Sequence, residues 1–172
     1  MNLLFRVLLV FFKSLFGRKL GTLDESVLTL RVLPGDLDAL GHMNNGRYLS
    51  IMDLGRVDLM TRTGMSRAAI RRKWHPLVGS AAIRFHRPLK PFKKYQLKSR
   101  LICWDDKWFY IEQRFESEGE LKALGLIKGL LRRRDENIPT AEVLKAMGAA
   151  VSSPPLPESI RRWIEMDRQA GE

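Results

Sequence analysis

The fold is decided by residues 33–64, LPGDLDALGHMNNGRYLSIMDLGRVDLMTRTG. The first third is a polar loop with turn-forming residues, and the remainder carries apolar residues at the 3.6-residue period of a helix. We predict a helix over Arg47 to Arg62, capped by Asn44 or Asn45. Its apolar face should carry Tyr48, Ile51, Met52, Gly55 and Leu59, and its polar face Asp53, Arg56, Asp58 and Arg62.

Gly55 falls on the apolar face of this predicted helix, where glycine costs about 1 kcal/mol relative to alanine. A glycine in such a position indicates close contact with another backbone. We therefore expect the helix to press against a sheet.

The loop before the helix predicts a catalytic site. A helix N-terminus offers unpaired N–H groups and a positive dipole end, which stabilise negative charge on a substrate carbonyl oxygen. Asp38 lies six residues before Asn44 and could act there as a general base or a nucleophile. The alternative is that Asp36 and Asp38 only form turns and that His42 only satisfies hydrogen bonds of the loop, without a catalytic role.

The run from Asp38 to Asn45, DALGHMNN, with Tyr48 ten positions after the aspartate, resembles the active-site loop of hotdog-fold thioesterases. Together with WDDKWFYIEQRF (104–115), it is most similar to the thioesterase superfamily member 6-like group, which is 4-hydroxybenzoyl-CoA thioesterase-like. Leu40 stands where plant acyl carrier protein thioesterases have an asparagine. Asn44-Asn45 stand where small bacterial acyl-CoA thioesterases have Tyr-His or similar.

The resemblance implies hydrolysis of an acyl-CoA or acyl carrier protein thioester at a subunit interface. Asp38, His42 and Asn45 would be catalytic, with backbone N–H groups near 45–48 as oxyanion donors. The substrate would contact Gly41, Asn44, Gly46, Arg47, Tyr48, Arg84, His86 and Arg87. We expect no metal, and no cofactor beyond coenzyme A as part of the substrate. The alternative is a non-catalytic, membrane-associated protein of the same fold that binds acyl groups or partners.

The flanking sequence completes an α+β pattern. Period-two alternation predicts strands over 27–33, 77–87, 95–104, 107–116 and 121–132, a short connection over 66–73, and helices over 140–147 and 157–167. We predict a hotdog domain over 24–135, in which a five-stranded antiparallel sheet wraps a long central helix, followed by a helical extension over 136–172. Open sheet edges predict a homodimer or a larger assembly.

Residues 1–20 form a separate N-terminal segment. Its core, NLLFRVLLVFFKSLF (2–16), is too short an apolar run to span a bilayer. Arg6 and Lys13 would lie on one stripe of a helix. This pattern predicts a helix at the membrane interface, with its apolar side in the bilayer and its cations near anionic head groups. A helix packed on its own domain or across a dimer is the alternative. A secretory signal is disfavoured, because a basic n-region and a small-residue cleavage site are missing.

The formal net charge of +11 is concentrated locally. Residues 84–100 contain no acid and hold seven cations, namely Arg84, Arg87, Lys90, Lys93, Lys94, Lys98 and Arg100. Such a field attracts nucleic acid, anionic lipid, CoA phosphates or an acidic carrier protein. We disfavour nucleic acid, because strand alternation places Phe85 opposite Arg84 and His86, as suits a core residue.

Cysteine usage and motifs narrow the chemistry. Cys103 is the only cysteine, which excludes an intrachain disulfide and predicts a reducing, cytoplasmic setting, either free or peripheral on the inner membrane face. We expect Cys103 to be a small core residue. The chain lacks G-x-S-x-G, Walker, H-E-x-x-H and paired C-x-x-C motifs, which removes the usual serine-hydrolase, nucleotide and zinc interpretations.

Overall fold

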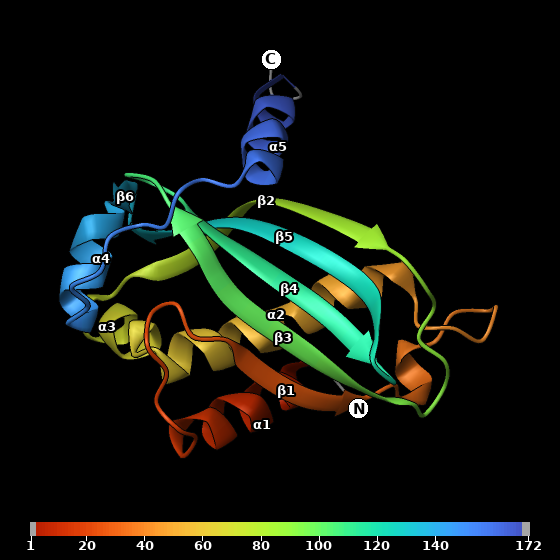
Figure 1. Cartoon of the computed structure of the whole chain (residues 1–172). Coiled ribbons are helices and arrows are strands. Elements are labelled where there is room, and N and C mark those ends of the chain that lie inside the picture. Colours follow the sequence, from red (N-terminus) through yellow and green to blue (C-terminus); the bar gives the residue numbers. More distant parts are fainter. Residues whose placement is uncertain (1–2, 170–172) are drawn as a thin grey trace.

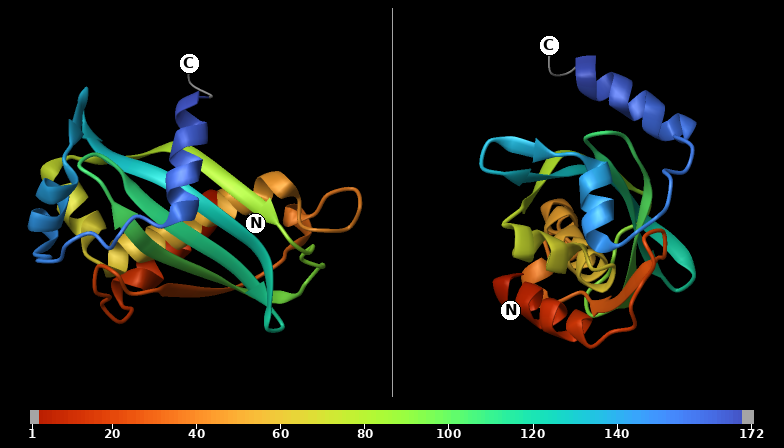
Figure 2. Two further views of the ribbon diagram at one scale, coloured as in Figure 1. Left: turned by 45° about the horizontal axis from the view of Figure 1, so that its top comes forward. Right: turned by 90° about the vertical axis from the view of Figure 1, so that its left-hand side faces the viewer.

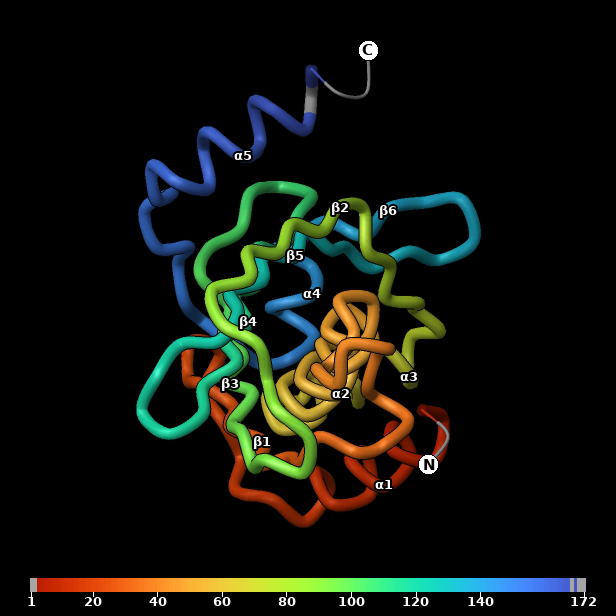
Figure 3. The backbone as a smooth tube through the Cα atoms, turned by 90° about the vertical axis from the view of Figure 1, so that its right-hand side faces the viewer, coloured from red at the N-terminus to blue at the C-terminus, as the bar shows by residue number. Residues whose placement is uncertain are grey.

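A long helix lies in the hollow of a curled sheet. The computed structural model describes residues 3–169, except the side chain of Arg168. Helix α2 (Asn45–Arg62) is wrapped by antiparallel strands in the order β1-β3-β4-β5-β2, with β6 paired to β5 (Figures 1 and 3). The strands are β1 (Ser26–Arg31), β2 (His75–Phe85), β3 (Lys94–Trp104), β4 (Phe109–Ser117), β5 (Glu120–Arg133) and β6 (Glu136–Ile138). The predicted α+β architecture is confirmed.

The other helices surround this unit. They are α1 (Leu3–Leu15), the 3-10 turn η1 (Pro34–Asp36), α3 (Met65–Arg72), α4 (Thr140–Met147) and α5 (Glu158–Gln169). Helix α1 lies beside α2 where the sheet leaves it open, while α3 and α4 gather at the C-terminal end of α2 (Figure 2). Helix α5 starts on the outer face of the sheet, where Ile160 and Trp163 pack against Cys103 and Tyr110.

The core forms where α2 meets the concave face of the sheet. Ile51, Met52 and Leu54 are fully buried and pack with Leu97 and Phe115 of the sheet. Each such side chain contributes roughly 1.5–3 kcal/mol when it leaves water. The apolar periodicity of the sequence therefore identified the helix and the face that it buries.

Gly55 makes a close approach to the sheet, but to side chains rather than to the backbone that its position predicted. A Cβ atom there would lie 2.6 Å from Nε2 of Gln113 and 2.8 Å from Cδ2 of Leu97, and closer still to the Ser99 hydroxyl. The contact atoms belong to side chains of β3 and β4 rather than to their backbone. The absence of a side chain at Gly55 lets α2 settle onto the sheet.

The predicted polar face of α2 is partly wrong. Asp58 is buried, because α1 packs over it: its carboxylate accepts hydrogen bonds from Ser14 of α1 (2.5 Å) and from Ser26 of β1. Arg56 points toward the sheet and donates to Oε1 of Gln113 (3.1 Å). Helical periodicity alone does not reveal a second layer that covers the polar side of a helix.

One boundary and one side-chain orientation also differ from the predicted ones. The charged segment after β5 continues as a hairpin, in which Arg132 pairs with Asn137 of a sixth strand, β6. The predicted domain end at residue 135 therefore falls inside the β5–β6 turn. The expected stripe of Arg6 and Lys13 is also wrong for Arg6, which is 4% exposed and faces the domain. Among the described residues, no helix is both long and apolar enough to cross a bilayer.

Candidate functional site

The loop between η1 and α2 is organised by Asp38. Its Oδ1 accepts the backbone N–H groups of Leu40 (2.9 Å) and His42 (3.2 Å), and its own N–H donates to the carbonyl oxygen of His42 (2.9 Å). Gly41 adopts a positive φ of 74°, which permits the reversal. Within residues 3–169, Oδ2 of Asp38 has no hydrogen-bond partner. Asp38 thus shapes the loop with one oxygen and leaves the other without a partner among the described residues.

Asn44 caps α2, as one of the two predicted cap residues. Its side-chain oxygen accepts the N–H of Gly46 (2.9 Å), and its carbonyl oxygen accepts the N–H of Arg47 (2.9 Å). Asn45 is exposed beside them. A substrate oxyanion near Gly46 would therefore replace the Asn44 side chain as acceptor.

Arg47 and Tyr48, both predicted to contact substrate, turn toward the protein. Arg47 donates to Oδ1 of the buried Asp36 (3.1 Å). Tyr48 is 2% exposed, with its ring against Phe85 and Phe115. Burial raises the pKa of its hydroxyl, which accepts the N–H of Leu89 at 3.3 Å. In this single chain Arg47 therefore binds η1, and Tyr48 binds the segment after β2.

The segment after β2 lies against the Asp38 loop. The N–H of Met43 donates to the carbonyl oxygen of Leu89 (3.0 Å), which joins the two segments at one end of the sheet (Figure 3). Arg84, His86 and Arg87 are all exposed at this end. The structure therefore brings the predicted phosphate-binding residues near the predicted catalytic loop.

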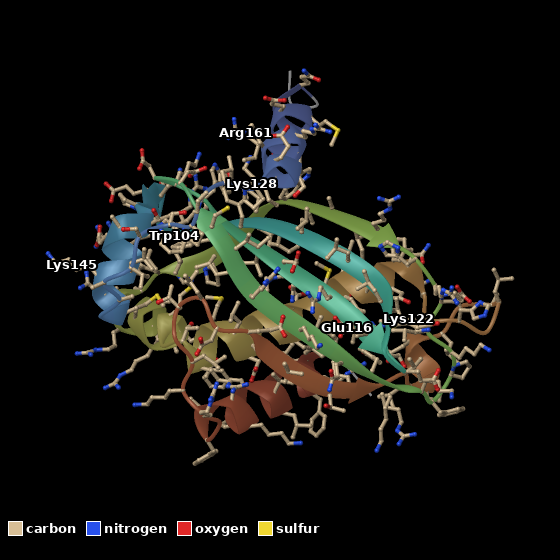
Figure 4. The ribbon with its side chains drawn as sticks, in the orientation of Figure 1. Trp104, Glu116, Lys122, Lys128, Lys145 and Arg161 are labelled. Carbon is tan, nitrogen blue, oxygen red and sulfur yellow. The ribbon has the colours of Figure 1, made fainter. Side chains whose placement is uncertain are left out.

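Glutamate side chains partly neutralise the positive charge of this region. Arg87 pairs with Glu120 (3.5 Å), and other members of the 84–100 run do likewise: Lys93 with Glu118, Lys98 with Glu116, and Arg100 with Glu112. Figure 4 shows Glu116 and Lys122 at this end of the sheet. In the described chain, Arg84, Lys90 and Lys94 have no ion pair. Partial neutralisation leaves fewer cations for an anionic ligand than the sequence count suggests.

An apolar cavity of about 360 Å³ lies alongside the second half of α2. Its volume is within the usual range for small-molecule sites. Its walls are apolar side chains of α2, β2, β4 and β5, and its polar members include Asp53 and Arg56. This cavity was not predicted from the sequence.

Asp53 and Arg56 belong to a hydrogen-bonded network at the cavity wall. Arg56 pairs with Asp53 and donates to Gln113, whose Nε2 in turn donates to the Met52 carbonyl oxygen (2.9 Å) and to Ser99 Oγ (2.9 Å). Burial lowers the pKa of the Arg56 guanidinium, and the Asp53 carboxylate opposes that shift. One signal was visible in the sequence: Gln113 interrupts an otherwise apolar strand face, where a buried amide needs partners.

Asp38 does not line this cavity within one chain. Along α2 the lining begins at Asp53, eight residues after Asn45, which is about 12 Å of helix. Leu77 and Val78 of β2 also line it, and they are 43% and 49% exposed. Among the described residues, no strand pairs with the outer side of β2. The cavity therefore lies beside an open sheet edge.

Comparisons with known proteins agree with this architecture. Residues 32–164 match the family model described as the thioesterase-like superfamily. The chain is 36% identical to Protein THEM6 of Xenopus laevis over 137 residues, which is 78% of this chain and 64% of that protein. It is 37% identical to Protein THEM6 of Danio rerio over 145 residues, covering 83% of this chain and 70% of that protein. The chain thus spans less than two thirds of the Xenopus relative.

The fold is also found among solved structures. A thioesterase of Thermus thermophilus, solved with coenzyme A and zinc, superposes with a TM-score of 0.59 at 24% identity, covering 79% of this chain and 94% of that one. At this identity the likeness concerns the fold alone.

Proposed function

The chain belongs to the thioesterase-like superfamily, has the hotdog fold and falls in the THEM6-like group, and from this premise we propose that it hydrolyses an acyl-CoA thioester. One observation carries the proposal: an aspartate with one unengaged carboxylate oxygen stands before the capped N-terminus of α2, next to an exposed basic segment. CoA is the proposed carrier because the exposed cations Arg84 and Arg87 beside this loop could bind its phosphates.

The proposed reaction uses Asp38 at the thioester carbonyl. As a general base, its Oδ2 takes a proton from water while the water oxygen attacks the carbonyl carbon. As a nucleophile, it forms a mixed anhydride that water then hydrolyses. Either route releases a carboxylic acid and the CoA thiol. N–H groups at the start of α2, including that of Gly46, would receive the developing oxyanion in place of the Asn44 side chain.

We further propose that each site combines two chains. The open β2 edge can pair with β2 of a second copy about a two-fold axis, as in isologous dimers. Strand β2 begins beside the C-terminal end of α2 and ends beside the Asp38 loop (Figure 1). Antiparallel pairing therefore brings the Asp38 loop of one copy toward the cavity of the other. The acyl chain would enter that cavity, and Arg84, His86 and Arg87 would contact CoA phosphates.

A non-catalytic acyl-binding protein is the second candidate. It is favoured by the turn-forming role of Asp38, whose Oδ1 is committed to the N–H groups of Leu40 and His42. In that case the loop aspartate is structural and the cavity alone is functional. The expected lack of a cofactor and the cytoplasmic location stay predictions.

Thiol release from acyl-CoAs of graded chain length separates the two candidates. We expect turnover by the wild type and a loss of roughly 10²- to 10⁴-fold in Asp38→Asn, with an unchanged circular dichroism spectrum. Asp24→Asn, an exposed loop aspartate, is the matched control and should retain activity. Equal turnover by Asp38→Asn and the wild type would refute the role of Asp38. No release from any thioester by the folded wild type would favour the acyl-binding protein.

A further inference from the structure

Helix α1 presents an unusually apolar side to solvent. The side that faces the domain carries Val10 together with the polar Arg6 and Ser14, which are 4% and 5% exposed. The side that faces solvent carries the apolar side chains of Phe5, Leu8, Leu9, Phe12 and Leu15, and Phe16 follows directly after the helix. These side chains are from 41% to 90% exposed. A contiguous apolar strip of this kind on a soluble domain marks an interaction surface.

A basic cleft lies at the C-terminal end of this strip. Its volume is about 790 Å³, and it is formed by the end of α1, the α2–α3 turn, α3 and α4. Its lining includes five cations and no acid: Lys19, Arg62, Arg67, Arg71 and Arg72. Arg62 is neutralised by Asp58 and Arg72 pairs with Glu142. Lys19, Arg67 and Arg71 have no ion pair anywhere in residues 3–169.

The strip and the cleft face the same side of the molecule. Helices α1 and α3 lie together on the side away from α5 and from the outer face of the sheet (Figure 2, right). Ile70 of α3, 68% exposed, adds an apolar side chain beside Arg67 and Arg71. We call this surface the docking face: the exposed apolar residues of α1 together with Lys19, Arg67, Ile70 and Arg71.

The charge of the docking face selects its occupant. The first acidic residue of the chain is Asp24, and no acidic residue occurs between Asp58 and Asp105. The two segments that build the docking face, 1–23 and 59–104, therefore carry only positive charges. A second copy of the chain would set these cations against each other, which is unfavourable across an interface. A bilayer with anionic lipids instead offers an apolar interior to the strip and phosphate groups to the cations.

We propose that the docking face binds the surface of an anionic bilayer. The apolar strip of α1 enters the boundary between head groups and acyl chains, while Lys19, Arg67 and Arg71 bind lipid phosphates in the cleft. The proposal does not depend on thioester hydrolysis, because none of these residues belongs to the proposed catalytic loop or cavity.

Vesicle flotation of the full chain tests this proposal. The vesicles are pure phosphatidylcholine, or phosphatidylcholine with about one third phosphatidylglycerol, which supplies the surface charge that polybasic segments require. We expect the wild type to float with the anionic vesicles and to be released by high salt. The triple variant Lys19→Gln/Arg67→Gln/Arg71→Gln should lower the partition coefficient on the order of a hundredfold. Leu8→Gln/Phe12→Gln should abolish flotation.

Matched controls separate docking from general charge and from dimerisation. Lys107→Gln/Arg134→Gln/Arg161→Gln removes the same number of exposed cations from other faces and should float like the wild type. Wild type that stays unbound with anionic vesicles would overturn the proposal. So would a control variant that loses binding as fully as the Lys19/Arg67/Arg71 variant. A dimer in analytical ultracentrifugation that dissociates in Leu8→Gln/Phe12→Gln, without flotation of the wild type, would assign the face to a second copy.

Discussion

Nη1 of Arg6 lies 2.9 Å from each carboxylate oxygen of Asp36, and the two side chains are 4% and 1% exposed. Arg6 belongs to the first half of α1, and Asp36 ends η1, directly before the Asp38 loop. Arg47 of α2 approaches the same carboxylate at 3.1 Å. One buried aspartate therefore ties the N-terminal helix and the central helix to the candidate catalytic loop.

Replacing Asp36 should strongly destabilise the protein. Asp36→Ala leaves the buried Arg6 guanidinium without its partner, and such a loss costs about 3–5 kcal/mol. The free energy of unfolding, measured in urea, checks this value. Asp135→Ala, at an exposed turn position, is the control and should change stability by about 0.5 kcal/mol or less. Equal effects of the two substitutions would show that the ion pair is not stabilising.

Gly55→Ala should destabilise by about 1–3 kcal/mol, because the new methyl group would overlap Ser99, Gln113 and Leu97. Alanine otherwise favours helix, so any loss must come from this overlap. Gly35→Ala is the control, since no atom lies within 4 Å of a Cβ there. Thermal unfolding of both variants provides the comparison, and a Gly55→Ala protein as stable as Gly35→Ala would contradict the tight contact.

The Cys103 thiol should react slowly in the folded protein. Burial, with a smaller contribution from Asp105, raises its pKa to about 11 from 9.0. At pH 8 the thiolate fraction is therefore about a hundredfold lower than in the unfolded chain. Because the unfolded thiol ionises first, its contribution to stability is complete below pH 9 and declines above it. Labelling with a thiol reagent, native against denatured, measures the ratio, and similar rates would place Cys103 at the surface.

Mixed dimers should reveal whether sites span two chains. Asp38→Asn removes the carboxylate, and Met60→Trp fills the cavity that Met60 lines. If the Asp38 loop of one chain serves the cavity of the other, each mixed dimer keeps one intact site. Refolding the two inactive variants together should then restore about a quarter of wild-type turnover. No recovery, with mixed dimers demonstrated by tagged pull-down, would place each site within one chain.

Much of the fold could be predicted from periodicity and turn residues. The α2 boundaries, the four consecutive strands and α4 follow from local patterns that agree with the final packing. Helix α1 shows the limit: its composition predicted an apolar helix, but only the folded chain shows that Arg6 and Ser14 face inward. Those positions depend on Asp36 and Asp58, which are 30 and 44 residues away along the chain.

Only the part of the candidate site that is contiguous in the sequence could be predicted. The loop with Asp38, Gly41, His42 and Asn44 is contiguous, so its sequence describes it well. The cavity is assembled from several strands and helices, and its polar wall joins Arg56 to Gln113, 57 residues apart. The inward turn of Tyr48 agrees with its predicted place on the apolar face of α2, whereas its ring partners, Phe85 and Phe115, lie far away along the chain and follow only from the folded packing.

The two inward polar side chains of α1 also fix how the helix is rolled about its own axis. Arg6 and Ser14 are eight residues apart, and each is held by a buried carboxylate, those of Asp36 and Asp58. Rolling α1 to bury its apolar side would leave both carboxylates without these partners. The orientation of the apolar strip of α1 is thus fixed in the unbound protein, so binding there would lose little conformational entropy. Any surface that holds α1 would also hold the Asp38 loop at a defined height and tilt.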